Sequence, residues 1–501
     1  MCGLLLTQEI RPHVFLPIYF ETQSSFIHTI LNKKQTAITM REMQPAHNVA
    51  VTIHRSSLLM MIKCKTLLIL LMALTLCTAA YAQPLDKAKL DQFFDRLSEK
   101  DKAMGSLFIS KDANVQYTRS IGYSQINGID KKPATAATKY RIGSVTKMFT
   151  AALIFQLAEE GRLKLTDHLD KFYPQIPNSN KITIANILAH RSGIHDVSED
   201  QDVRTHRTSG ISKEDMMTFI AKSKADFEPD TKYAYSNSGY FILGSIVEKV
   251  TGKSYNEAFK KQIASKIGLK DTYMGTGNID ANHNESFSYR YSRDWEQLPI
   301  THNSILFGSG AMISTPADQA KFIQALFNEK IVSKASLAQM MQNQLGMTTF
   351  TYNGKTFYGH TGGIDNFGSW LVYQPEEKLV VSYATNAKVY PVSNIIDGVF
   401  DIYYNKPFTI PSFESIAIST EELEKYVGVY SSAGAPVKFT VTRDGTKLFV
   451  QLTNQSAIPL VPTAPDRFKI ESAPVEFLFD TAKKEMTVIR NGREKVFTKE
   501  G

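Results

Sequence analysis

Ser144 and Lys147 form a Ser-x-x-Lys pair whose residue types and spacing can activate a nucleophile. Positions i and i+3 share one face of a helix, so the Lys147 amine can reach the Ser144 hydroxyl. A serine hydroxyl needs a base nearby, and packing a lysine into a helix interface lowers its pKa towards a useful range. A helix N-terminus adds partial positive charge and an N–H for an oxyanion. The pair predicts acyl transfer by Ser144, although on its own it also fits an ordinary solvated helix face.

Tyr235-Ser-Asn237 is a second candidate, placed just before a predicted helix. If Lys147 lies beside Tyr235, its ammonium stabilises a phenolate, and Tyr235 can then take the serine proton. The Asn237 amide can hold a substrate carbonyl. The alternative interpretation is a core tyrosine followed by an asparagine that caps the helix.

The third candidate runs from His360 through Thr361 and Gly362 to Gly363. We predict that it ends the strand after the Asn353-Gly354 hairpin. Two glycines let a substrate backbone approach a strand edge closely, and the Gly363 N–H can be a second oxyanion donor. An ordinary glycine-containing strand end is the alternative.

The order Ser-x-x-Lys, Tyr-x-Asn, His-Thr-Gly resembles that of the serine beta-lactamase and penicillin-binding-protein superfamily, specifically its class C-like branch. Two further segments, 187–194 and 308–318, are similar to segments of that family. The resemblance covers about residues 85–405. It implies that Ser144 is acylated, that Lys147 and Tyr235 share the base role, that Asn237 orients the substrate, and that the Ser144 and Gly363 amides form the oxyanion hole.

His360 departs from the Lys-Thr-Gly of class C beta-lactamases. Histidine is mostly neutral at pH 7, so it contributes less than a lysine to binding the carboxylate of a β-lactam. We therefore expect a serine hydrolase acting through an acyl-enzyme on D-amino-acid peptides, as a D,D-carboxypeptidase or D-aminopeptidase does, or on small esters. The alternatives are a class C-like beta-lactamase and a penicillin- or muropeptide-binding sensor without turnover. The expected partner is a small peptide, peptidoglycan-fragment or ester substrate, with no cofactor and no metal.

The elements that position these residues indicate an α+β fold. Hydrophobic periodicity predicts helices over 84–100, 144–160, 238–250 and 391–404, with another from Thr315-Pro316. Turn signals predict strands within 106–124 and two hairpins over 348–358 and 369–383. The resemblance implies a beta-lactamase/transpeptidase-like antiparallel sheet, flanked by helices, with an all-α insertion. We expect a hydrolase domain over 83–405, a linker over 406–420, and a small lipocalin-like β-barrel over 421–501.

Composition limits the remaining possibilities. The chain of 501 residues has a formal charge of +8, but residues 1–82 hold seven basic and three acidic residues, leaving only +4 elsewhere. No basic block alternates with aromatics, so we expect no nucleic-acid partner.

Residues 61–82 have the basic start, the short apolar core and the small-x-small end of a signal peptide. The apolar core is too short to form a stable membrane anchor. We expect export to the periplasm or beyond after cleavage near Ala82, and an unstructured, non-native extension over 1–60. Cys2, Cys64 and Cys77 all precede that site, so the mature chain would lack disulfides.

Overall fold

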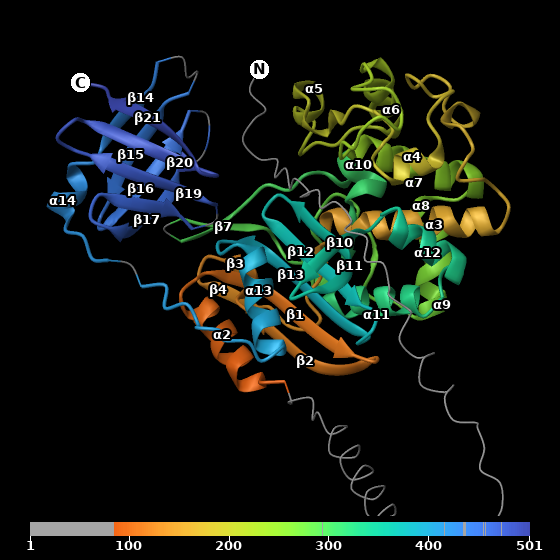
Figure 1. Cartoon of the computed structure of the whole chain (residues 1–501), viewed down its shortest axis with the longest axis horizontal. Helices are drawn as coiled ribbons and strands as arrows, with labels where there is room; N and C mark the ends of the chain where they lie inside the picture. Colours follow the sequence, from red (N-terminus) through yellow and green to blue (C-terminus); the bar gives the residue numbers. More distant parts are fainter. Residues whose placement is uncertain are drawn as a thin grey trace, which may run out of the picture. The chain divides into compact units, whose positions relative to one another are not determined.

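The computed structural model describes residues 85–292, 294–414, 416–433, 437–453, 455, 457–471 and 473–501 (Figure 1). The predicted extension 1–60, the predicted signal peptide 61–82 and the three cysteines lie outside the described residues. Within the described part of the chain, no helix combines the length and the apolar character needed to cross a membrane.

A six-stranded antiparallel sheet forms the centre of the larger part, in the order β10-β11-β12-β13-β1-β2. The first strand of the chain, β1, therefore lies between β2 and the last strand of the same sheet, β13. Both predicted hairpins are confirmed, and the second is longer at both ends than its sequence pattern indicates. The strands are β1 (Ala103–Lys111), β2 (Asn114–Ile121), β10 (Thr348–Tyr352), β11 (Lys355–Ile364), β12 (Phe367–Gln374) and β13 (Leu379–Lys388).

Helices cover both faces of this sheet, because alternate strand residues point to opposite sides. On β12, Leu371 belongs to a large core that includes residues of α3, α7 and α11, whereas Val372 belongs to a smaller core with α2 and α13. The predicted helices are confirmed to within three residues at each end. Their bounds are α2 (Lys87–Glu99), α3 (Thr146–Glu159), α7 (Asn237–Thr251), α11 (Pro316–Phe327) and α13 (Val392–Tyr403).

The chain between β2 and β10 supplies a mainly helical insertion and three small sheets, β3-β4, β5-β9-β6 and β7-β8. Its further helices are α4 (Ile184–Leu188), α5 (Gln201–Arg204), α6 (Lys213–Lys222), α8 (Tyr255–Phe259), α9 (Ser265–Ile267), α10 (Asn303–Leu306) and α12 (Lys334–Gln342). Its strands are β3 (Tyr123–Asn127), β4 (Asp130–Pro133), β5 (Tyr140–Arg141), β6 (Tyr273–Met274), β7 (Tyr289–Tyr291), β8 (Trp295–Gln297) and β9 (Met312–Ser314). Single 3-10 turns are η1 (Gly143–Val145), η2 (Leu169–Lys171), η3 (Val197–Glu199), η5 (Ala281–His283) and η6 (Phe307–Ser309), and η4 (Lys260–Ala264) is a short π-helix.

The C-terminal part is a closed eight-stranded barrel with its own hydrophobic core, which confirms a barrel there. The turns at Asp444-Gly445 and Asn491-Gly492 join neighbouring strands as predicted. Between Tyr403 and Thr420, the described residues form neither helix nor strand. The elements are α14 (Thr420–Glu424), β14 (Gly428–Ser431), β15 (Phe439–Asp444), β16 (Lys447–Leu452), β17 (Ile458–Ala464), β18 (Arg467–Ile470), β19 (Val475–Asp480), β20 (Glu485–Arg490) and β21 (Arg493–Lys499).

Candidate active site

Ser144 lies in the short turn η1, directly before α3 and against strand β11. Gly143 has φ of +51°, and a Cβ there would lie 2.7 Å from the Gly363 amide nitrogen. Gly362 meets the other side of the turn, since a Cβ on it would lie 2.0 Å from the Ile142 carbonyl oxygen. Both glycines are therefore required for η1 and β11 to approach this closely.

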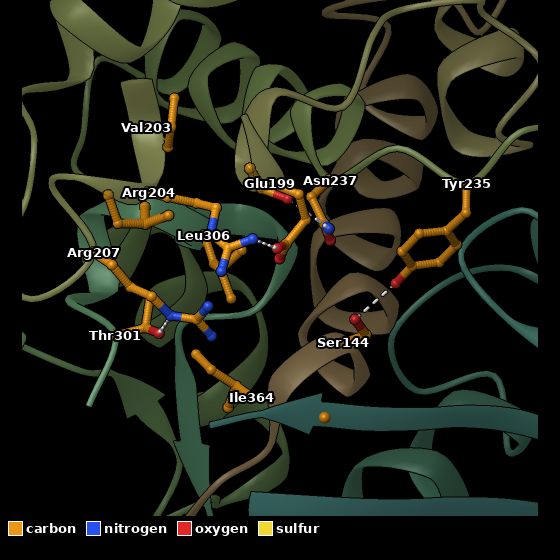
Figure 2. Close-up of a pocket in the computed structure, with 13 residues that line it drawn as sticks. Ser144, Glu199, Val203, Arg204, Arg207, Tyr235, Asn237, Thr301, Leu306 and Ile364 are labelled. Carbon is orange, nitrogen blue, oxygen red and sulfur yellow. Dashed lines mark hydrogen bonds and ion pairs between the residues drawn. The ribbon is translucent and has the colours of Figure 1, made fainter. Parts of the chain in front are cut away.

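The structure brings the Ser144 hydroxyl next to both predicted partners. Lys147 Nζ donates to Ser144 Oγ at 3.2 Å, and the Tyr235 hydroxyl donates to the same oxygen at 2.7 Å. Figure 2 shows the Tyr235 phenol pointing at Ser144 from a separate segment. Lys147 and Tyr235 therefore both contact Ser144 Oγ. Helical spacing from Ser144 places Lys147 there, and the segment ahead of α7 places Tyr235 there.

Lys147 is fully buried at the base of this site. Its Nζ also donates to Asn237 Oδ1 and to the Ser309 carbonyl, each at 2.8 Å, and lies 4.6 Å from the Tyr235 ring centre. Burial lowers the pKa of Lys147 to about 7, against the opposing effect of the Asp196 carboxylate. Near neutral pH, a large fraction of Lys147 is therefore the free amine that a base requires.

We expected Tyr235 to be a phenolate, but its surroundings favour the protonated hydroxyl. Burial of its hydroxyl raises the pKa above the ordinary value, and the hydrogen bond with Ser144 opposes this only in part. The side chain keeps 38% of its surface exposed, but the hydroxyl faces inward to Ser144. One ring face stacks on His190, with centroids 4.3 Å apart. The raised pKa thus favours the protonated phenol at neutral pH, because burial disfavours the charged phenolate.

Asn237 has protein partners on both ends of its amide. Its oxygen accepts from Lys147, and its Nδ2 donates to Asp196 Oδ2 at 3.0 Å and to Ser198 Oγ at 3.3 Å. Asn237 therefore links Lys147 to Asp196 and Ser198, while the expectation that its amide holds a substrate carbonyl stays a prediction. Sequence reasoning missed Asp196 and Ser198, and the only signal for them is their place just after the family-like segment 187–194.

His360, Thr361, Gly362 and Gly363 form the last part of β11, which ends one residue later at Ile364, so the prediction that they end this strand is confirmed to within one residue. The strand continues because Gly363 pairs with Gly368 of β12. Pairing with β10 stops at Gly359, which leaves the other edge of residues 360–364 facing η1. Burial lowers the pKa of His360 to about 4, so this histidine is neutral, as expected. Its Nδ1 bonds the Thr361 carbonyl, and its ring centroid lies 6.5 Å from that of Tyr235.

A cavity of ≈ 210 Å³ opens beside Ser144. Its wall includes Ser144, Tyr235, Asn237 and Gly363, together with side chains that sequence reasoning did not single out (Figure 2). These further lining residues are Ser198, Glu199, Val203, Arg204, Arg207, Thr301, Ile305, Leu306 and Ile364. Among the residues that the structure describes, no group of three or more His, Cys, Asp or Glu side chains is placed to hold a metal ion.

Sequence and structure comparisons agree with this geometry. The family model described as Beta-lactamase matches residues 90–403. Penicillin-binding protein 4* of Bacillus subtilis is 24% identical over 445 residues, which are 81% of this chain and 97% of the relative. The D-alanyl-D-alanine-carboxypeptidase/endopeptidase AmpH of Escherichia coli is 24% identical over 390 residues, covering 68% of this chain and 99% of the relative.

Solved structures show the same fold. An octameric penicillin-binding protein homologue from Pyrococcus abyssi superimposes with a TM-score of 0.58 at 26% identity, covering 83% of this chain and all of that one. The D-amino acid amidase from Ochrobactrum anthropi SV3 gives a TM-score of 0.58 at 22% identity, over 64% of this chain and 99% of that one. The family match spans more than half of the chain, and the chain therefore belongs to the beta-lactamase family as a serine hydrolase related to the penicillin-binding proteins.

Proposed function

We propose that this protein hydrolyses D-amino-acid peptides, or small esters of similar shape, through an acyl-enzyme on Ser144. One observation carries the proposal: Ser144 Oγ lies 3.2 Å from the amine of Lys147, whose pKa is about 7. A nucleophile in contact with a base whose pKa lies near neutral pH suits acyl transfer.

In the acylation step, the neutral Lys147 amine takes the Ser144 proton while Oγ attacks the substrate carbonyl carbon. The amides of Ser144 and Gly363, held together by the Gly143 contact, stabilise the oxyanion. The Tyr235 hydroxyl gives its proton to the leaving amine or alkoxide as the bond to the acyl carbon breaks. The Lys147 ammonium then returns a proton to Tyr235, and water releases the acyl group by the reverse transfers.

The substrate class rests on relatives and on His360. AmpH is named for D-alanyl-D-alanine carboxypeptidase and endopeptidase activity, and a structurally similar enzyme is a D-amino acid amidase. A neutral His360 offers no cation at the position where class C beta-lactamases have lysine. This favours peptides or esters over β-lactams as the substrate.

Labelling with fluorescent penicillin and with a fluorophosphonate tests the mechanism. Wild type should be labelled and Ser144→Ala should not, whereas Ser198→Ala, a serine in the same cavity, should retain the label. Turnover of D-Ala-D-Ala peptides, p-nitrophenyl esters and nitrocefin then separates the activities. Equal labelling of Ser144→Ala refutes the nucleophile, and labelling without any turnover identifies a sensor instead.

We also propose that the chain is exported, with cleavage after Ala82, a hydrolase domain over 83–405, a linker over 406–420 and a barrel domain over 421–501. The signal-like segment 61–82 supports export. The separate hydrophobic core of the barrel supports the domain boundary. Mass spectrometry of the protein recovered outside the cytoplasm tests cleavage after Ala82. Limited proteolysis tests the domain boundary, since the first cut should fall within 406–420. A mature chain that retains residues 61–82 would refute cleavage.

A further inference from the structure

The cavity beside Ser144 extends away from the proton donor. In Figure 2, Tyr235 lies on one side of Ser144, and Arg204, Arg207 and Thr301 lie on the other. If Tyr235 protonates the leaving group, as in the proposed function on which this inference rests, the leaving group departs on its side. The acyl part that stays on Ser144 therefore extends into the wall that carries the two arginines.

Arg207 is held with its guanidinium at this wall. Its Nε donates to Thr301 Oγ1 at 2.7 Å, and its backbone carbonyl accepts from His302 at 2.7 Å. The side chain remains 42% exposed, so a ligand can reach it. A guanidinium fixed through Nε presents its two terminal nitrogens for a planar anion, and one of them, Nη2, also lies 3.6 Å from Asp365 Oδ1.

The nearest carboxylate, Asp365, is already engaged by other groups. It is 5% exposed and accepts from the backbone and hydroxyl of Thr301, at 3.0 and 2.7 Å. The buried guanidinium of Arg141 lies 3.2 Å from its Oδ2, whereas Arg207 lies 3.6 Å from its Oδ1. Since Arg141 offsets the charge of Asp365, most of the Arg207 charge faces the cavity.

Two further cations lie near this wall. Lys388 Nζ lies 3.8 Å from where a Cβ on Gly363 would be, and the Asp365 charge acts on it as well. Arg204 has only a 3.8 Å contact with Glu199, between side chains that are 49% and 71% exposed. Exposed pairs at such distances contribute little. The charged side chains that line the cavity are Arg204, Arg207 and Glu199, so two cations face one carboxylate and the wall is positive.

Four apolar side chains, Val203, Ile305, Leu306 and Ile364, also line the cavity, beside the polar Ser198, Glu199 and Thr301. We propose that this cavity selects substrates whose acyl group is a short aliphatic chain ending in a carboxylate, as in an acidic amino-acid residue, and that Arg207 binds this carboxylate.

A length-matched pair of esters tests the proposal: p-nitrophenyl hexanoate and the mono-p-nitrophenyl ester of adipate. Wild type should prefer the adipate ester. Arg207→Gln should lower the ratio of kcat/KM for adipate over hexanoate by about 10- to 100-fold, the range for a lost hydrogen bond to a charged group. Hexanoate hydrolysis should change little, which shows that the variant is folded, and Arg207→Lys should retain part of the preference. Lys334→Gln, the same charge change at an exposed position outside the cavity, should leave the ratio unchanged.

An unchanged ratio in Arg207→Gln, or a wild type without preference for adipate, overturns the proposal. Calorimetric titration of Ser144→Ala with adipate measures the same site without turnover. If Ser144→Ala binds adipate and the double variant with Arg207→Gln does not, the anion site is supported. If, in addition, neither ester is hydrolysed, only the proposed function fails. Absence of adipate binding in Ser144→Ala overturns the anion site alone.

Discussion

Asp196→Asn should lower the pKa of Lys147 and move the acid limb of the pH–rate profile to lower pH. Asp196 acts on Lys147 through Asn237, with 2.8 Å from Lys147 Nζ to Asn237 Oδ1 and 3.0 Å from Asn237 Nδ2 to Asp196 Oδ2. The carboxylate favours the ammonium form of Lys147, so its removal favours the amine. Asparagine can still accept the hydrogen bond from Asn237, which makes this a change of charge rather than of shape.

The magnitude follows from the distance between the two charges. At roughly 8 Å and an effective dielectric constant of about 20, a unit charge pair interacts by about 2 kcal/mol, which corresponds to about 1.5 in pKa. Because Asp196 is half-buried, solvent screening reduces this value. We therefore expect a pKa lower by about 0.5 to 1.5 than the wild-type value, which is about 7.

The assay is kcat/KM for a neutral p-nitrophenyl ester across the acid and neutral range. Activity should rise with pH as Lys147 loses its proton, and in Asp196→Asn this rise should occur at lower pH. Asp202→Asn, the same change at an exposed position on α5, should leave the profile in place. An acid limb that stays where it is in Asp196→Asn, or moves to higher pH, would refute Lys147 as the base under the control of Asp196.

Two substitutions test the packing that holds the site. Gly362→Ala places a Cβ 2.0 Å from the Ile142 carbonyl, so η1 and β11 must separate and kcat should fall about 100-fold with an unchanged circular dichroism spectrum. Gly354→Ala, in the open turn of the same hairpin, should keep kcat, and equal losses in both variants would contradict the argument. Phe149 is fully buried and stacks on Phe322 with centroids 3.8 Å apart. Phe149→Ala should lower the free energy of unfolding in urea by about 3–5 kcal/mol, and a loss no larger than that of Phe149→Leu would contradict this.

Much of the site could be predicted because its residues lie in short local patterns. Helical spacing places Lys147 beneath Ser144, and a helix start follows Tyr235 in the sequence itself. The hairpin ahead of His360 fixes the strand that carries Gly363. These relations depend on neighbours within a few residues, which one sequence displays directly.

Other features depend on contacts between distant segments. Asn237 meets Asp196 only after the loop following segment 187–194 packs on α7, so its amide partner is not visible in the sequence. The continuation of β11 through two glycines depends on Gly368 of β12. Tyr235 remains a phenol because of burial, which sequence reasoning weighed less than the nearby lysine. Arg207 looks like any exposed arginine until the fold places it beside Thr301.

The pairing of β1 with β13 affects the stage of synthesis at which the site around Ser144 can fold. Ala103 pairs with Lys388, and Lys111 pairs with Leu379, so the middle of the sheet joins opposite ends of the hydrolase segment. Contacts between such distant residues close large loops and slow folding. During synthesis, Ser144 and Lys147 emerge long before β11, β12 and β13 exist to hold η1 in place. A growing chain therefore cannot bring η1 and β11 together until it is nearly complete through Lys388, and under the proposed mechanism Ser144 stays inactive while the chain is being made.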